Sequence, residues 1–376
     1  MAPPGAPGEF SLEQDRRWAR RWIPEGYRQE RSLNRPWHVR AAAGLHVAVV
    51  GAGSWGTAFA RHLVLCGHRT VLYARRPEQA EVMRHRGRNP EYLDSVDLPV
   101  GLEYDVYPHP RLRGADVVVI AVPSRAYRSV LAVLAPYLQE GVGLLSLTKG
   151  MDPVTQSRFS EVLKKELHAV HPDIAVLSGP NQAEEVALDQ PTATVIASAD
   201  REYAEALQLL ITNQNLRAYV NEDLLGVELA GAVKNVVALA TGMSDGLGYG
   251  DNARAALVTR GLAEISRLGL ALGADIRTFA GLAGLGDLVG TCTSRHSRNR
   301  MAGQLIAQGY SAEHVEEQMG MVAEGLTSAP IILDLSRTHG VDMPITENVV
   351  AVIEEGKSVT ACVCDLMTRR LRSEVW

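Results

Sequence analysis

The chain has 376 residues, of which 46% are hydrophobic and 22% are charged, and its formal net charge is −5. This length exceeds one ordinary domain and this composition suits a globular protein with a sizeable core, so we expect two domains. The slightly acidic balance excludes a general affinity for nucleic acid or for an anionic membrane surface. No apolar run approaches the roughly 18 residues of a membrane span.

The four cysteines are too few for a disulfide framework. Cys362 and Cys364 lie one residue apart, but no second pair of cysteines or histidines completes a zinc site, so we expect no metal and reduced, cytoplasmic thiols.

Residues 1–44 form an N-terminal extension that starts with a Pro/Gly/Ala-rich stretch and holds three of the five tryptophans. It lacks the apolar core of a secretory signal, and it contains acids that transit peptides avoid. We expect this tail to pack on the body or on a partner subunit; the alternative is a start codon assigned too far upstream.

From Leu45 onward, short apolar runs alternate with helical stretches. Runs that are apolar on both faces are typical of buried parallel strands, and the helices between them of crossovers. We therefore predict an α/β fold with a Rossmann-type, doubly wound parallel sheet over residues 45–222. The predicted strands are His46–Val50, Thr70–Tyr73, Asp116–Val122, Gly143–Leu147, Ile174–Ser178 and Thr192–Ala197.

Beyond about Asn221 the strand pattern gives way to helical spacing. Residues 223–376 are therefore predicted to form an all-helical, substrate-binding domain. The predicted helices are Asp223–Thr241, Ala253–Ala274, Arg298–Gly309, Ala312–Met319, Ser328–Thr338 and Glu347–Glu355.

A glycine-rich loop, Gly51-Ala52-Gly53-Ser54-Trp55-Gly56, follows the first predicted strand and leads into a predicted helix. Gly51 suits the tight turn, Gly53 the approach of the backbone to a pyrophosphate, and Gly56 the close packing of helix on strand. Free N–H groups at the helix N-terminus attract the same anion. Strand, loop and helix in this order predict a dinucleotide site.

Two arginines, Arg75 and Arg76, follow the next predicted strand. An NAD-selective enzyme usually has Asp or Glu there for the ribose 2′-hydroxyl, whereas two guanidiniums suit a 2′-phosphate. Glu78 is a weaker candidate for the ribose. We predict that NADP is accepted or preferred; the alternative is that both arginines are solvated loop charges.

Lysines are rare in this chain, being only five of the 38 basic residues, so a lysine in an apolar or glycine-rich stretch stands out. Lys149 follows a predicted strand, at the carboxyl edge where open α/β sheets bind ligands. Lys234 lies on a mostly apolar predicted helix, where desolvation lowers the pKa of an ammonium toward the range of an acid/base catalyst. The alternative for Lys234 is an ammonium that extends into solvent.

A third polar region begins with Gly284-Leu285-Gly286-Asp287 and ends with Ser297-Arg298-Asn299-Arg300. Hydroxyls, an amide and guanidiniums in front of a helix predict a phosphate site. For Asp287 the alternative is a cap at the start of a helix.

Together these segments resemble NAD(P)-dependent glycerol-3-phosphate dehydrogenases of the bacterial type. GAGSWGTA, LTKG, SGP, ELAGAVKNV, GDNARAALVTRGLAE, GLAGLGDL, TCTS and SRNR occur in the order of that family, from about Leu45 to Glu355. The resemblance implies reversible reduction of dihydroxyacetone phosphate to sn-glycerol 3-phosphate with NAD(P)H and without a metal. It further implies a cytoplasmic homodimer that supplies glycerol phosphate for phospholipid synthesis.

The resemblance also implies roles for individual residues. Lys234 would donate and accept the proton, and Lys149 would touch both the substrate and the nicotinamide. Asp287 and Asn235 would orient the catalytic ammonium and the substrate hydroxyls. Further substrate contacts would come from Gly179, Asn181, Ser297, Arg298 and Asn299, and further cofactor contacts from Ala183, Arg298, Val322 and Glu324.

One segment departs from the family pattern, because Asn181-Gln182 stands where the family usually has Ser or Thr and then Phe. Asn181 can still donate and accept hydrogen bonds, whereas Gln182 changes the local packing.

Two other functions fit parts of the pattern. A β-hydroxyacid or ketopantoate-type reductase shares the two-domain layout and a catalytic lysine, but the Ser297–Arg300 cluster favours a phosphorylated substrate. A dinucleotide-sensing protein without turnover would not need both Lys149 and Lys234 in a lysine-poor chain.

Overall fold

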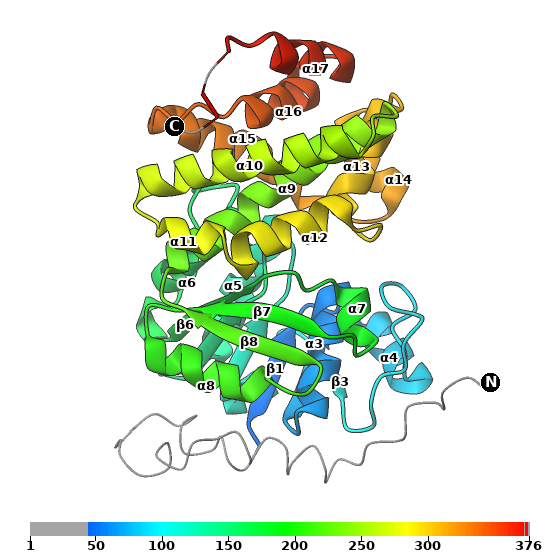
Figure 1. The fold of residues 1–376 in the computed structure, drawn as a ribbon. Coiled ribbons are helices and arrows are strands. Elements are labelled where there is room, and N and C mark those ends of the chain that lie inside the picture. The colour runs from blue at the N-terminus through cyan, green and yellow to red at the C-terminus, as the bar shows by residue number, and fades with distance from the viewer. Residues whose placement is uncertain (1–43, 372, 375–376) are drawn as a thin grey trace, which may run out of the picture.

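A computed structural model describes residues 44–371 and 373–374. It has an α/β domain built on an eight-stranded sheet and, stacked against one end of that sheet, an all-helical domain (Figure 1). The predicted fold class is confirmed. The predicted N-terminal extension lies outside the described residues except for Gly44, so its packing stays a prediction.

The sheet has the strand order β3-β2-β1-β4-β5-β6-β7-β8. Neighbouring strands from β3 to β6 are parallel, and the order reverses between β1 and β4. Ligands of open α/β sheets bind at such a switch point, beyond the carboxyl ends of the strands. The strands are β1 (His46–Val50), β2 (Arg69–Ala74), β3 (Glu103–Val106), β4 (Val117–Ile120), β5 (Gly143–Ser146), β6 (Asp173–Ser178), β7 (Thr192–Ala197) and β8 (Leu216–Asn221).

The all-parallel prediction was wrong for β7, which runs antiparallel to β6. The connection between them contains only the helix α7 (Ala183–Ala187). Five helical residues rise about 7 Å, whereas six strand residues span about 20 Å, so this helix is too short to carry the chain back along the sheet.

Two strands, β3 and β8, were missed because neither is an apolar run. All residues of β3 are half-buried at the edge of the sheet, and Arg217 and Tyr219 of β8 are exposed.

Helices cover both faces of the sheet and bury its central strands. On one face Phe59 and Leu63 of α3 and Tyr203 of α8 pack on the strands, and on the other Tyr127 of α5 and Phe159 of α6. The helix α3 starts within the glycine-rich loop, at Ser54, a few residues after the carboxyl end of β1. The helices of this domain are α3 (Ser54–Leu65), α4 (Pro77–Arg86), α5 (Tyr127–Leu134), α6 (Phe159–Glu166), α7 and α8 (Arg201–Ile211).

The second domain is built around the long helix α9 (Leu224–Gly246). Contrary to our expectation about apolar runs, α9 is long and apolar enough to cross a membrane; most of it is buried inside the domain, as in a core helix. Four of the surrounding elements were not predicted: α11 (Ile276–Phe279), a π-helical turn (Leu282–Gly286), α12 (Asp287–Thr293) and α17 (Val359–Thr368). The predicted ones are α10 (Asp251–Leu272), α13 (Arg298–Ala307), α14 (Ala312–Met319), α15 (Glu324–Thr338) and α16 (Pro344–Glu355).

Glycines bring α9 and α13 into backbone contact. A Cβ atom on Gly242 of α9 would lie 1.9 Å from the carbonyl oxygen of Arg300, and one on Gly303 of α13 would lie 2.1 Å from that of Leu239. No larger residue fits either position without moving a helix, so these glycines set the distance between the two helices.

Candidate active site

The glycine-rich loop has the geometry that a dinucleotide requires. Gly51 has a φ of +113°, and a Cβ atom there would lie 2.3 Å from the carbonyl oxygen of Ala121. A Cβ atom on Gly56 would lie 1.9 Å from the carbonyl oxygen of Gly51, whereas one on Gly53 would meet nothing within 4 Å. Gly51 and Gly56 thus allow tight packing, and Gly53 leaves open space where a pyrophosphate can approach the backbone.

The other residues of the loop turn their side chains toward neighbouring segments. The Ser54 hydroxyl donates a hydrogen bond of 3.1 Å to the carbonyl oxygen of Tyr92. The half-buried Trp55 ring packs 5.5 Å from that of Phe59 and against an apolar cluster that includes Ala183, the first residue of α7. The helix α7 therefore packs beside α3, and the contact of Ala183 with the cofactor stays a prediction.

Arg75 and Arg76 lie between the end of β2 and the start of α4. Arg75 and Glu78 are exposed, whereas Arg76 forms an ion pair with Glu91 from the loop after α4. Glu91 was not predicted from the sequence, because no local pattern marks an exposed acid 15 residues away as the partner of this arginine.

The two singled-out lysines meet at Asp287. The Lys149 ammonium donates hydrogen bonds to the carbonyl oxygen of Gly179 (3.0 Å), to Asn181 Oδ1 (2.9 Å) and to Asp287 Oδ2 (2.8 Å). The Lys234 ammonium donates to Asp287 Oδ1 (2.5 Å) and to Thr291 Oγ1 (2.8 Å).

The alternative interpretations of Lys234 and Asp287 are wrong. Lys234 does not extend into solvent, since its side chain is only 6% exposed, and Asp287 starts α12 without capping it.

Burial governs the charges at this junction. The pKa of Lys234 is lowered to about 8: desolvation is the largest cause, the nearby Lys149 ammonium also lowers it, and Asp287 opposes both effects. Burial alone would raise the pKa of Asp287, but the two ammoniums outweigh it and hold that pKa below its usual value. Lys234 can therefore exchange a proton near neutral pH while Asp287 stays a carboxylate.

The predicted phosphate segment divides into exposed and buried parts. Ser297 caps α13, accepting a hydrogen bond of 3.3 Å from the backbone N–H of Arg300. Arg298 is exposed at the start of this helix. The Arg300 side chain pairs with the buried Asp245 at 2.6 Å, so its guanidinium is engaged in joining α13 to α9.

Asn235 makes no hydrogen bond to the Lys234 ammonium, and its predicted contact with the substrate hydroxyls stays a prediction. Its Oδ1 accepts a hydrogen bond of 3.0 Å from Asn299, and its Nδ2 donates to the carbonyl oxygen of Gly231. Adjacent residues of an α-helix point about 100° apart, so neighbours in sequence do not face the same point. Asn299 Oδ1 in turn accepts from the backbone N–H of Gly325, which ties α13 to α9 and α15.

Glu324 and the half-buried Val322 lie at the start of α15, where the helical domain meets the loop after β4. Glu324 accepts hydrogen bonds from the backbone N–H of Ser124 (3.0 Å) and from its hydroxyl. Burial raises the pKa of this carboxyl. The next residue, Arg125, bonds Thr327 and pairs with Glu316, each at 2.8 Å. Ser124 and Arg125, which were not predicted from the sequence, join the two domains beside the site.

Residues 46–204 match the family model for the N-terminus of NAD-dependent glycerol-3-phosphate dehydrogenase, and residues 223–364 match the model for its C-terminus. The chain belongs to this family. The predictions of the family, of the enzyme class and of a nicotinamide cofactor are therefore confirmed.

Two curated members of the family are similar over most of their length. The chain is 49% identical to glycerol-3-phosphate dehydrogenase (NAD(P)+) of Moorella thermoacetica over 330 residues, which cover 88% of this chain and 97% of the relative. It is 46% identical to that of Shouchella clausii over 331 residues, with coverage of 88% and 97%. The crystal structure of glycerol-3-phosphate dehydrogenase from Coxiella burnetii has 37% identity and a TM-score of 0.83, covering 87% of this chain and 99% of that one.

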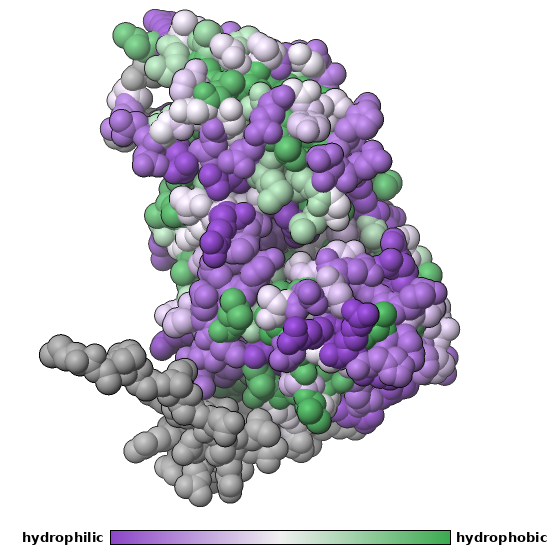
Figure 2. Space-filling view, turned by 90° about the vertical axis from the view of Figure 1, so that its right-hand side faces the viewer, coloured by the Kyte–Doolittle hydropathy of each residue, from purple (hydrophilic) through white to green (hydrophobic). Residues whose placement is uncertain are grey.

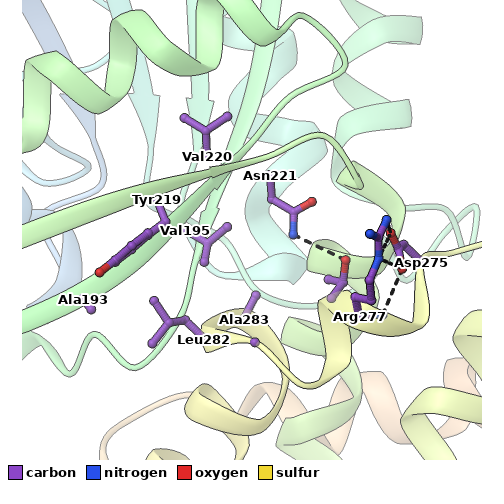
Figure 3. A pocket seen from close by; sticks show the side chains of 11 residues that line it. Ala193, Val195, Tyr219, Val220, Asn221, Asp275, Arg277, Leu282 and Ala283 are labelled. Carbon is purple, nitrogen blue, oxygen red and sulfur yellow. Dashed lines mark hydrogen bonds and ion pairs between the residues drawn. The ribbon is translucent and has the colours of Figure 1, made fainter.

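One open cavity of this dehydrogenase lies away from the lysines. It has a volume of about 660 Å³ and lies between β7, β8 and the segment Gly281–Ala283 (Figure 3). Its charged residues, Asp275 and Arg277, pair with each other at 2.5 Å, and Asn221 donates to Thr278 at 3.4 Å. No predicted site residue lines this cavity, so we assign it no part in the chemistry.

A second cavity, of about 460 Å³, borders the site and is lined by Pro180, Gln182 and the segment Ser294–His296. Gln182 is half-buried there, so a polar side chain is tolerated where the family usually has Phe.

Figure 2 shows polar side chains around a recess between the two domains. Among the described residues, no three His, Cys, Asp or Glu side chains are grouped as a metal ion would require.

Proposed function

We propose that this protein interconverts dihydroxyacetone phosphate and sn-glycerol 3-phosphate with NAD(P)H. The observation that carries this proposal is the buried junction of Lys149, Asp287 and Lys234 between the two domains. It lies beyond the carboxyl ends of the strands, where a dinucleotide held by the glycine-rich loop would present its reactive end.

The residues that would hold the cofactor fit it. The backbone of Gly51–Gly56 and the N-terminus of α3 would bind the pyrophosphate, and Arg75 and Arg76 would bind a 2′-phosphate. Ala183, Val322 and Glu324 would make the further cofactor contacts that the family resemblance implies. When bound, the nicotinamide supplies the hydride in reduction and accepts it in oxidation.

Lys234 would serve as the general acid in reduction and as the general base in oxidation. As the carbonyl carbon is reduced, its oxygen gains negative charge, which the Lys234 ammonium stabilises before donating a proton. The pKa of about 8 suits transfer in both directions. Lys149, Lys234 and Asp287 together carry one positive formal charge, which favours an oxyanion at this point.

Lys149 would position the substrate from the Rossmann side of the junction. Its three ammonium protons are all used by Gly179, Asn181 and Asp287. A substrate hydroxyl or carbonyl must therefore replace or share one of these acceptors, and the side-chain acceptors can move more easily than the Gly179 backbone.

The phosphate group would bind at the start of α13. Arg298 is exposed there, and Ser297 caps the helix whose first N–H groups attract an anion. The buried Asn299 would act mainly by fixing this helix end against α9 and α15. Holding the phosphate contributes orientation and binding energy away from the reacting carbon.

Several broader statements belong to the same proposal. Residues 45–222 form the dinucleotide-binding domain, and residues 223–376 form the substrate-binding domain. The enzyme works as a homodimer in the cytoplasm, mainly in the reductive direction, and supplies glycerol phosphate for phospholipid synthesis. The four cysteines support a reducing compartment, because all are free thiols. Light scattering of the purified protein would test the homodimer.

The direct test is the loss of NADPH or NADH absorbance when dihydroxyacetone phosphate is added. We expect turnover with this substrate and none with unphosphorylated dihydroxyacetone, because the latter cannot use Arg298. Ketopantoate is the second control. Faster turnover of ketopantoate than of the phosphorylated substrate would contradict the proposal.

A further inference from the structure

An ion pair lies where the ribose of a bound dinucleotide is expected. Arg76 follows β2 and is the N-cap residue of α4, and its Nη2 contacts Glu91 Oε2. Both side chains are about half exposed, at 46% and 44%. The pair therefore lies on the surface, where a ligand can reach either partner.

Glu91 is held in place by the residues on either side of it. The fully buried Asn89 donates hydrogen bonds to the carbonyl oxygen of Ala52 (3.0 Å) and to Thr57 Oγ1 (2.8 Å). On the other side, the carbonyl oxygen of Tyr92 accepts a hydrogen bond from Ser54. These contacts fasten the loop that carries Glu91 to the glycine-rich loop, so the carboxylate stays near the cofactor site.

This position has a known chemical task in dinucleotide-binding folds. An acid at the end of the second strand accepts a hydrogen bond from the ribose 2′-hydroxyl, and it repels a 2′-phosphate. Here the end of β2 leads into Arg75 and Arg76 instead. Glu91 brings a carboxylate to the same place from a different segment of the chain.

We propose that Glu91 is a specificity-determining residue, which accepts a hydrogen bond from the adenosine ribose of NADH and competes with the 2′-phosphate of NADPH for Arg76. This inference rests on the proposed function, in which the two arginines face the ribose. It predicts an enzyme that uses both cofactors, because binding NADPH requires Arg76 to exchange the Glu91 carboxylate for a phosphate.

The test compares Glu91→Gln with the unchanged protein by fluorescence titration of NADPH and NADH and by kcat/KM for each cofactor. Removing the carboxylate frees Arg76 and ends the repulsion of the 2′-phosphate, so NADPH should bind about 5- to 10-fold more tightly. NADH should bind about 3-fold more weakly, because the amide is a weaker acceptor for the ribose hydroxyl.

Asp97→Asn is the matched control. Asp97 forms an exposed pair of the same kind with Arg88, at 2.6 Å, in the same region of the chain. The Asp97→Asn variant should leave the affinities for NADPH and NADH unchanged. An equal rise in NADPH affinity in this variant would mean that any lost surface acid suffices, and it would overturn the proposal.

A third variant separates this inference from the proposed function. Arg76→Gln should weaken NADPH binding, and adding Glu91→Gln to it should bring no gain. If Arg76→Gln weakens NADPH binding while Glu91→Gln changes neither affinity, the inference about Glu91 is wrong and the 2′-phosphate site stands. If Arg76→Gln leaves NADPH binding unchanged, the proposed 2′-phosphate site is wrong, and the role of Glu91 fails with it.

Discussion

Replacing Lys234 with methionine removes a buried ammonium and keeps most of the apolar stem. The lost group donates to Asp287 at 2.5 Å and to Thr291 at 2.8 Å, and it is the proposed proton donor. A positioned general acid contributes about 10²–10⁴ in rate, or about 2.7–5.4 kcal/mol of the barrier. We expect kcat for the reduction of dihydroxyacetone phosphate to fall by this factor.

The Lys234→Met variant should still fold, so the loss can be attributed to chemistry. Asp287 keeps the Lys149 ammonium at 2.8 Å, and the junction changes from one positive charge to neutral. Since no buried charge is left without a partner, we expect the free energy of unfolding to change by only about 1–2 kcal/mol.

Steady-state assays and cofactor titrations of the variant test this reasoning. Cofactor affinity should barely change, because the dinucleotide rests mainly on the first domain. Lys165→Met, which removes an exposed lysine, is the control and should be fully active. Lys149→Met should weaken substrate binding and turnover together. Near-normal kcat in Lys234→Met with no activity in Lys149→Met would refute the assignment and make Lys149 the proton donor.

Three further results are expected. Because burial lowers the pKa of Lys234 to about 8, kcat/KM for reduction should fall as the pH rises through about 8 and the ammonium deprotonates. For oxidation, which needs the neutral amine, kcat/KM should fall as the pH drops below about 8. A flat pH profile would contradict the assignment of Lys234. Arg298→Lys keeps the charge but loses the planar fork, so KM for the phosphorylated substrate should rise about 10-fold, and an unchanged KM would place the phosphate elsewhere. The buried Glu264 carboxylate of α10 accepts hydrogen bonds from the backbone N–H groups of Ile345 and Thr346 at the start of α16. Glu264→Gln should lower the free energy of unfolding in urea by about 1–3 kcal/mol, because the amide NH₂ would face these donors. Equal stability of the variant would show that these hydrogen bonds contribute little.

Local chemistry explains which parts of the site the sequence could predict. The glycine-rich loop was recognisable because six consecutive residues hold two glycines that close packing requires, Gly51 and Gly56, and a third, Gly53, that leaves room for a pyrophosphate. Lys234 stood out because a lone ammonium on an apolar helix must be either paired or exposed. Its partner Asp287 lies 53 residues further along the chain, and Lys149 lies 138 residues before Asp287. No spacing rule reaches across such distances, so only the family resemblance indicated that they meet.

The missed features share one physical origin, which is that partners come from other elements. The role of Asn235 came from the family resemblance, and the sequence did not show that helical geometry turns this side chain toward Asn299. β8 was overlooked because one of its faces is exposed and its residues alternate. The pairing of Glu91 with Arg76 depends on how the loop after α4 folds back on the glycine-rich loop.

The backbone contact between α9 and α13 has a consequence for substrate choice. α9 carries Lys234 and the start of α13 carries Arg298, so the close helix contact at Gly242 and Gly303 fixes the distance between the proposed proton donor and the proposed phosphate-binding arginine. The two helices thereby hold these two side chains at a fixed separation. We expect that a molecule one bond longer or shorter between its phosphate and its carbonyl cannot contact both Lys234 and Arg298 at once.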